Sequence, residues 1–147
     1  SGLPSTLQRG SCSPEIRSFN RSRIVNEMDV YARIGQEGFS RLVAAFYRHV
    51  PGDDILGSMY PNDDFAGAEE RLRGFLIQRF GGPTTYSDQR GHPRLRMRHA
   101  PFPVDVRARH RWIKLMTEAL AEAELPEEVV AILKPYFETT ATGMMNR

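Results

Sequence analysis

The sequence predicts an all-α domain. From Val30 onward, apolar residues recur at intervals of three and four, which is the spacing of one face of a helix. No stretch shows the sustained apolar–polar alternation of a β-strand, and there is no internal repeat. The 147 residues are enough for one domain with its own hydrophobic core and too few for two. We therefore expect a single helical domain.

The first half of the chain predicts two main helices. The first carries an apolar stripe that ends near Pro51-Gly52. The second starts at residues 61–64, where proline, asparagine and aspartate supply a helix start, and runs about four turns to a stop at residues 81–83. Residues 83–94 have the composition of a loop, which is long for a compact domain and for that reason a candidate functional segment.

The second half predicts three helices of unequal length. A short helical piece covers Leu95–His99, a long helix opens at Pro103, and a last helix opens at Pro126. Residues 1–27 differ, because Ser, Gly, Pro and Arg recur there and the apolar residues have no period. We interpret residues 1–27 as a mobile N-terminal extension and residues 28–147 as the domain.

Composition narrows the class of function. A net charge of +2 is too small to predict a nucleic-acid binder. The single cysteine, Cys12, cannot form an internal disulfide, no Cys/His cluster has zinc spacing, and no Cys-x-x-Cys-His motif exists for covalent c-type haem. No uncharged run approaches the roughly 20 residues of a membrane span, and no signal peptide is evident. We therefore expect a cytoplasmic protein without a membrane partner.

Among the four histidines, His99 has the most informative surroundings. Leu95 lies four residues before it and Phe102 three after, so apolar neighbours frame it on a helix face. A neutral imidazole in an apolar pocket is what ligation of haem iron requires. A lone histidine on an apolar face is nevertheless more often a core residue than a ligand, so position alone leaves both interpretations open.

Three large residues with polar tips add to this picture. Tyr47, Tyr60 and Trp112 are all expected to point inward from helical segments. Buried phenol and indole groups need hydrogen-bond partners, and a pocket for a polar diatomic ligand would supply one. Ordinary packing in a helical core would place the same residues equally well.

Several motifs together resemble the group II truncated haemoglobins, over nearly all of the chain from Met28 to the last helix. Residues 60–72 (YPNDDFAGAEERL) resemble that group's entry into the distal helix, and Gly81-Gly82-Pro83 followed by Tyr86-Ser87 resembles the turn after it. Residues 90–102 (RGHPRLRMRHAPF) resemble its proximal signature. Trp112 lies thirteen residues after His99, where this group carries its tryptophan.

The resemblance implies a shortened globin fold with helices arranged two over two around haem b. It implies His99 as the metal ligand and Tyr47, Tyr60 and Trp112 as distal hydrogen-bond donors to O2, CO or NO. The other implied haem-binding residues are Phe46, Ala68, Arg71, Leu72, Phe75, Leu76, Tyr86, Leu95, Arg98, Phe102 and Met116. Ala68 would occupy the gate position. Among them, Arg71 and Arg98, with Tyr86 behind them, are the candidates for holding the haem carboxylates.

Two functions remain to be compared. The first is reversible binding of O2 and related ligands. NO dioxygenase or peroxidase activity is also left open, and an unidentified reductase would be the partner. The second is a haem-free helical module that binds an acidic partner through residues 90–98, which contain four arginines. Pro93, Leu95 and Met97 interrupt that run, so the haem interpretation is preferred. The sequence leaves the formation of a homodimer open.

Overall fold

The computed structural model describes residues 26–60 and 64–147, and it confirms the all-α prediction for this part of the chain. The predicted extension, apart from Asn26 and Glu27, and the predicted helix start at residues 61–63 lie outside the described residues. The α-helices are α3 (Val30–His49), α4 (Phe65–Arg79), α5 (Thr85–Arg90), α6 (Leu95–His99), α7 (Val106–Glu122) and α8 (Glu127–Met144). Two 3-10 turns, η2 (Glu27–Asp29) and η3 (Gly57–Met59), complete the set.

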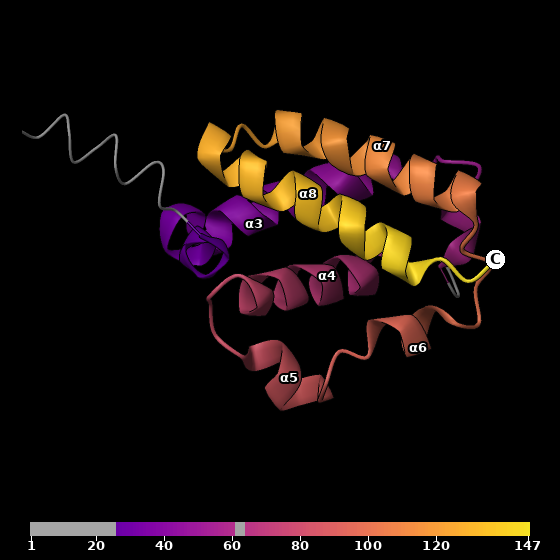
Figure 1. Ribbon diagram of the computed structural model, residues 1–147, viewed down its shortest axis with the longest axis horizontal. Coiled ribbons are helices and arrows are strands. Elements are labelled where there is room, and N and C mark those ends of the chain that lie inside the picture. Colours follow the sequence, from indigo (N-terminus) through magenta and orange to yellow (C-terminus); the bar gives the residue numbers. More distant parts are fainter. Residues whose placement is uncertain (1–25, 61–63) are drawn as a thin grey trace, which may run out of the picture.

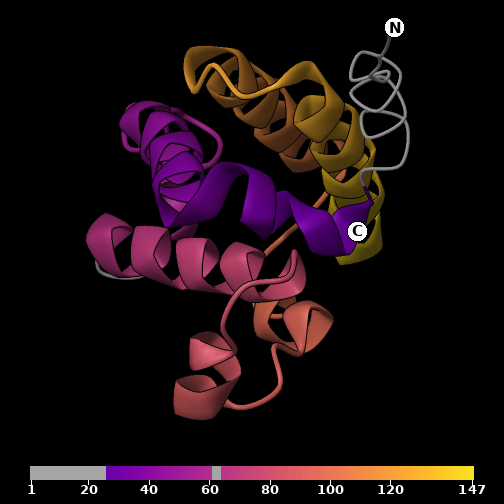
Figure 2. The ribbon, with the colours of Figure 1, turned by 90° about the vertical axis from the view of Figure 1, so that its left-hand side faces the viewer.

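The four long helices pack against one another in the order α4, α3, α7, α8. Helix α3 packs against both α4 and α7, and α7 packs against α8. Helices α5 and α6 lie together on the side of the molecule farthest from α7 (Figure 1), and the view turned by 90° shows the same separation (Figure 2). Helix α6 contacts α8. The molecule therefore has a four-helix body and a smaller α5–α6 segment beside it.

The core of the body is predominantly apolar. Among the described residues, no charged residue is buried as a whole, and Tyr47 and Tyr86 are the buried tyrosines. The largest fully buried side chains are Phe39, Phe46, Phe80, Leu42, Leu76, Met116 and Leu133. Each such burial stabilises the fold by about 1.5–3 kcal/mol before conformational entropy is subtracted. The 3–4 spacing of these residues in the sequence is thus the spacing of the buried faces.

Aspartate side chains set the starts of two long helices. Asp64 Oδ1 accepts a hydrogen bond from the Gly67 N–H at 3.0 Å, which caps α4. Asp105 Oδ1 accepts from the Ala108 N–H at 2.9 Å, so α7 begins at Val106 and not at Pro103 as predicted. The Asp105 backbone is extended, and its side chain satisfies one of the free N–H groups that every helix start leaves.

The prediction of a loop over residues 83–94 is wrong in its first half, because α5 forms there. The Gln78 side chain in α4 holds this helix, since its amide donates to Ser87 Oγ at 2.7 Å and accepts from the Ser87 N–H at 2.9 Å. Tyr86 is buried, with its ring 5.9 Å from that of Phe75. The helix ends at Gly91, whose φ of 79° suits glycine. These contacts come from outside the segment, so its local composition did not reveal them.

The short helix α6 has the predicted bounds but few local supports. No side chain caps its start, and Arg94 before it adopts a left-handed conformation with φ 48° and ψ 54°. None of its residues is buried. Its position depends on contacts with α8 and on hydrogen bonds from Asn146, two residues after the end of α8.

The start of the described chain is also ordered by side chains. Asn26 and Glu27, which the sequence analysis assigned to the extension, belong to the capped turn η2. Glu27 forms an ion pair with Arg79 of α4 at 2.8 Å. Within the described residues, no helix combines the length and the apolar composition that a membrane crossing requires.

Candidate functional site

A chain of aromatic rings joins the three predicted distal residues. The Phe46 ring lies 5.5 Å from Trp112 and 5.0 Å from Tyr47 between ring centroids. Tyr47 in turn lies 5.8 Å from Tyr60. These residues come from α3, from α7 and from the end of the segment that contains η3. The fold therefore gathers the predicted distal residues into one cluster in the body.

Two further aromatic residues extend this cluster. Phe65, the first residue of α4, lies 5.4 Å from the Tyr60 ring, and Phe137 of α8 lies 5.5 Å from the Trp112 ring. Sequence reasoning assigned both to helix stripes but not to the site. The signal for Phe65 was its position one turn before Ala68, on the same face of the helix.

The two phenols form a hydrogen-bonded pair. The Tyr47 hydroxyl donates to the Tyr60 hydroxyl at 3.3 Å. Burial raises the pKa of Tyr47 far above the ordinary phenol value, and the neighbouring Tyr60 raises it further. Burial also raises the pKa of Tyr60, although the hydrogen bond with Tyr47 opposes this. Both phenols therefore stay protonated at neutral pH and remain donors.

Two polar hydrogens of the cluster have no acceptor among the described residues. One bond joins the phenols, so the Tyr60 O–H is left for another acceptor. The Trp112 indole N–H, on a half-buried side chain, also has no acceptor in the described part of the chain. Donors in an apolar cluster without partners cost free energy, about 1–3 kcal/mol each when buried. A polar ligand placed against them would remove that cost.

The predicted gate residue and the predicted wall residues of α4 lie on one face of that helix. Ala68 and Leu76 of α4 are buried, and Leu72 and Phe75 are half-buried. Phe46 and Met116 are fully buried in the body. Ala68 presents only a methyl group at the predicted gate, so hydrogen-bond donation falls to the phenols and the indole.

The His99 ring is held by a hydrogen bond to the backbone of its own helix. Its Nδ1 lies 2.7 Å from the Leu95 carbonyl oxygen. A carbonyl can only accept, so Nδ1 carries the hydrogen, and the lone pair of the imidazole is on Nε2. The side chain is exposed and lies on α6, outside the core of the body. This hydrogen bond fixes both the tautomer and the orientation of the ring, as ligating histidines commonly show.

Asn146 holds the His99 segment and was missed by the sequence analysis. Its side-chain amide donates to the carbonyl oxygens of His99 at 3.3 Å and of Phe102 at 2.9 Å. Its Oδ1 accepts from the Val104 N–H at 3.0 Å, and its own N–H donates to the Val104 oxygen at 2.9 Å. Asn146 is 47 residues after His99, so no local pattern could indicate the contact.

The candidate haem-carboxylate residues have different surroundings. Arg71 is half-buried and lies 3.5 Å from Asp64 Oδ2, the carboxylate that caps α4. Arg98 is exposed, and its guanidinium donates to the carbonyl oxygens of Arg90 at 3.4 Å and His92 at 3.5 Å. Tyr86 is buried under α4. Arg98 is thus oriented by backbone carbonyls and forms no ion pair within the described residues.

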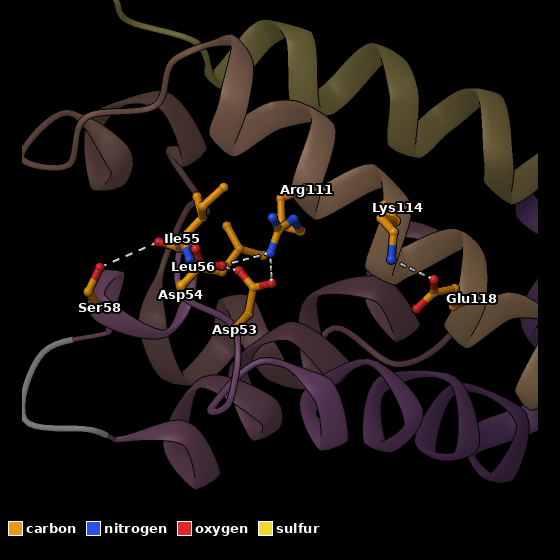
Figure 3. Close-up of polar contacts among 8 residues, drawn as sticks. All are labelled: Asp53, Asp54, Ile55, Leu56, Ser58, Arg111, Lys114 and Glu118. Atoms are coloured by element: carbon orange, nitrogen blue, oxygen red, sulfur yellow. Dashed lines mark hydrogen bonds and ion pairs between the residues drawn. The ribbon is translucent and has the colours of Figure 1, made fainter.

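An ion-pair network braces the segment that leads to Tyr60. Asp53 and Asp54 both pair with Arg111 of α7, as Figure 3 shows. Asp53 Oδ2 also accepts hydrogen bonds from the Ile55 N–H at 3.0 Å and the Leu56 N–H at 2.8 Å. Burial raises the pKa of Asp53, but these N–H groups and the Arg111 guanidinium outweigh it and hold the pKa below its usual value.

The structure thus separates the predicted site into two groups. The distal and wall residues from α3, α4 and α7 belong to the body. Leu95, Arg98, His99 and Phe102 lie on or just after α6, outside the body's core. Half-buried apolar side chains remain on both groups, Leu72 and Phe75 on one and Leu95 and Phe102 on the other.

Comparison with known proteins gives one consistent family. The family model described as bacterial-like globin matches residues 29–146. A group 2 truncated haemoglobin of Bacillus subtilis is 36% identical over 117 residues, which cover 80% of this chain and 88% of that protein. The chain belongs to the group II truncated haemoglobins.

Solved structures support this assignment. The haemoglobin of Chloroflexus aurantiacus is 47% identical with a TM-score of 0.77, over 80% of this chain and 98% of its own. A haemoglobin from Thermobifida fusca is 45% identical with a TM-score of 0.77, over 80% and 96%. A truncated oxygen-avid haemoglobin from Bacillus subtilis is 35% identical with a TM-score of 0.76, over 80% and 98%.

Membership in this globin family implies a haem cofactor and binding of small gaseous ligands such as O2. The residues of this chain fit such a cofactor. The His99 ring is oriented by a hydrogen bond, half-buried apolar side chains lie on two separate groups, and two donors in the distal cluster have no acceptor in the part of the chain that the structure describes. A haem-free helical module is not favoured.

Proposed function

We propose that this globin binds haem b through His99 and binds O2 at the iron, with Tyr60 and Trp112 as the donors that face the ligand. One observation carries the proposal: the hydrogen bond from His99 Nδ1 to the Leu95 carbonyl, which directs Nε2 away from its own helix backbone. A haem held by a single histidine keeps one iron coordination position for O2, CO or NO.

The distal cluster favours retention of a polar ligand. Tyr47 donates to Tyr60 and so orients the second phenol, whose O–H remains available. The Trp112 N–H is available from α7 on the other side of Phe46. Two such hydrogen bonds in an apolar cluster contribute about 1–3 kcal/mol together, which is roughly a fivefold to 150-fold change in an equilibrium or a rate. We infer slow release of O2.

The apolar and cationic residues complete the proposed haem site. Phe46, Ala68, Leu72, Phe75, Leu76 and Met116 form the wall on the body, and Leu95 and Phe102 form the wall on the α6 side. Arg98 holds one haem carboxylate, and Arg71 holds the other once its long contact with Asp64 is exchanged. Tyr86 packs against Phe75 and supports that wall.

The proposed distal roles are tested by O2 dissociation from the ferrous protein. Trp112→Phe keeps most of the ring contacts but removes the N–H, and Tyr60→Phe removes the hydroxyl. We expect each variant to release O2 about ten times faster than wild type, as measured by stopped-flow replacement of O2 with CO. Phe137→Leu is a packing control, because Phe137 contacts Trp112 and carries no donor. Rates equal to wild type in both donor variants would contradict the distal roles.

Slow release suits redox chemistry better than oxygen delivery. We propose NO oxidation as the reaction to test first: one NO, one O2 and one electron yield one nitrate, so the protein also needs a reductase. Nitrate formation from NO by the oxygenated protein, measured under limiting reductant, should follow the electrons supplied. Absence of nitrate at any electron supply would contradict this reaction and would leave peroxidase activity to be assayed.

A further inference from the structure

Among the described residues, the positive charge is concentrated on one segment, and residues 1–25 carry four further arginines and one glutamate. Residues 85–99 contain four arginines and one acidic residue, whereas residues 26–84 and 100–147 together contain twelve Lys or Arg and sixteen Asp or Glu. Both views place α5 and α6 together on one side of the molecule (Figures 1 and 2). The α5–α6 segment is therefore a basic surface on an otherwise acidic domain.

Most arginines outside this segment form an ion pair, although Arg107 and Arg109 of α7 form none among the described residues. Arg90, Arg94, Arg96 and Arg98 are all exposed, and none forms an ion pair with a carboxylate in residues 26–60 or 64–147. On α7, by contrast, Arg111 pairs with Asp53 and Asp54, and Lys114 pairs with Glu118 at 2.9 Å (Figure 3). A hollow of about 310 Å³ beside those α7 residues is lined by Ile55, Arg107, His110, Arg111 and Lys114, and its Arg111 and Lys114 are paired with carboxylates.

One of the four arginines has another role in the proposed function. Arg98 is oriented by the carbonyl oxygens of Arg90 and His92, and we assigned it to a haem carboxylate. Arg90, Arg94 and Arg96 remain, and we call these three the arginine patch. They flank the segment that carries His99, so a protein bound to them would lie beside the proposed haem site.

We propose that the arginine patch is the docking surface for an acidic electron-donor protein. The proposal rests on the proposed function, since O2 binding requires ferrous iron and each oxidation to ferric iron removes one electron that a donor must return. Opposite charges on two proteins accelerate their encounter and fix its orientation. A donor docked on these arginines would lie beside the haem that His99 holds, which suits electron transfer.

An acidic protein fits this surface better than a nucleic acid does. The patch spans only residues 90–96, and the remaining domain has more acidic than basic residues. A long phosphate backbone would extend past the patch onto repelling surface, whereas a compact acidic face would not. The unequal charge distribution therefore favours a protein partner.

The test uses holoprotein in the ferric state and reduced flavodoxin, an acidic flavin-containing protein, as the probe donor. Stopped-flow absorbance in the presence of CO gives the second-order rate constant of haem reduction. The patch variant is Arg90→Glu/Arg96→Glu, and the matched control is Lys114→Glu/Lys134→Glu, which changes net charge equally on α7 and α8. The same proteins are assayed at ionic strengths of about 0.01 M and about 0.5 M.

We expect the patch variant to be reduced about tenfold more slowly than wild type at low ionic strength, with the control within about twofold. The difference should vanish at high ionic strength, and CO association with the ferrous protein should be equal in all three. Equal reduction rates in the patch and control variants would overturn docking while leaving haem binding intact. A third outcome would be that wild type binds a DNA duplex tightly, that only the patch variant loses this binding, and that reduction by flavodoxin is unchanged. This outcome would overturn protein docking in favour of nucleic-acid binding. A protein without a haem band would instead contradict the proposed function itself.

Discussion

The four-helix body and the α5–α6 segment are stabilised in different ways. In the body, apolar side chains from α3, α4, α7 and α8 are fully buried, and aspartates cap the starts of α4 and α7. Helix α6 buries none of its residues, lacks a side-chain cap and follows a left-handed arginine. The distal residues therefore lie on a body that is stabilised by its own core. His99, the proposed iron ligand, lies on α6, whose position depends on a few hydrogen bonds. Sequence patterns that arise from burial are accordingly more informative for the body than for the α5–α6 segment, where α5 was missed.

The largest expected effect concerns the body. Phe39 is fully buried, and its ring lies 6.2 Å from that of Phe80. Phe39→Ala should lower the free energy of unfolding by about 3–5 kcal/mol. Met97→Ala on α6, where the side chain is 58% exposed, is the matched change and should lower it by less than about 0.5 kcal/mol in haem-free protein. Urea denaturation measures both, and similar losses would contradict the proposed difference between the two regions.

The next effect concerns the brace between the body and the segment before Tyr60. Asp53→Asn should destabilise the protein by about 1–3 kcal/mol at neutral pH, because it weakens the pairing with Arg111. The lowered pKa of Asp53 means that its contribution is present above the ordinary carboxyl pKa and is lost as pH falls through the folded-state value. As the pH falls below about 4, the variant should therefore lose less stability than the wild type loses. If the free energy of unfolding, measured by chemical denaturation, changed with pH in the same way in both proteins, this role of Asp53 would be ruled out.

A smaller effect should appear where α8 holds α6. Asn146→Ala removes the hydrogen bonds to the His99 and Phe102 carbonyls, so the ligand segment loses its tether. We expect haem affinity to fall about tenfold or more while the stability of the haem-free protein stays nearly unchanged. Hemin titration and urea denaturation measure the two quantities. The control is Thr142→Ala in α8, four residues before Asn146, and equal haem affinities in both variants would contradict the tether.

The smallest effect concerns the backbone before α6. Arg94 has a φ of 48°, which glycine adopts more easily than arginine. Arg94→Gly should therefore change stability by no more than about 1 kcal/mol, because relief at this residue is offset by the flexibility of glycine in the unfolded chain. Hydrogen exchange of the α6 amides checks this. A large loss of protection in the α6 amides would mean that the Arg94 side chain makes a contact needed for α6.

The sequence predicted the elements that bury apolar faces and the short helix Leu95–His99. It missed α5, because the Gln78 side chain that holds Ser87 lies in the preceding helix. It placed the start of α7 three residues early, since Pro103 resembled a first-turn proline while Asp105 makes the cap. Asn146 could not be found from any local pattern, because its role exists only after α8 folds against the His99 segment. Phe65 and Phe137 were visible as helix-stripe residues, but the ring contacts that add them to the distal cluster required the fold.

The most direct test of the central claim is hemin titration of wild type, His99→Ala and the control His92→Ala, followed by the haem absorption band and by its shift with dithionite and CO. Wild type and His92→Ala should bind one haem per chain and give the same CO-shifted spectrum. His99→Ala should bind haem more weakly with an altered spectrum, and added imidazole should restore the wild-type band. An unchanged spectrum in His99→Ala, or a wild-type protein that takes up no hemin, would contradict the account.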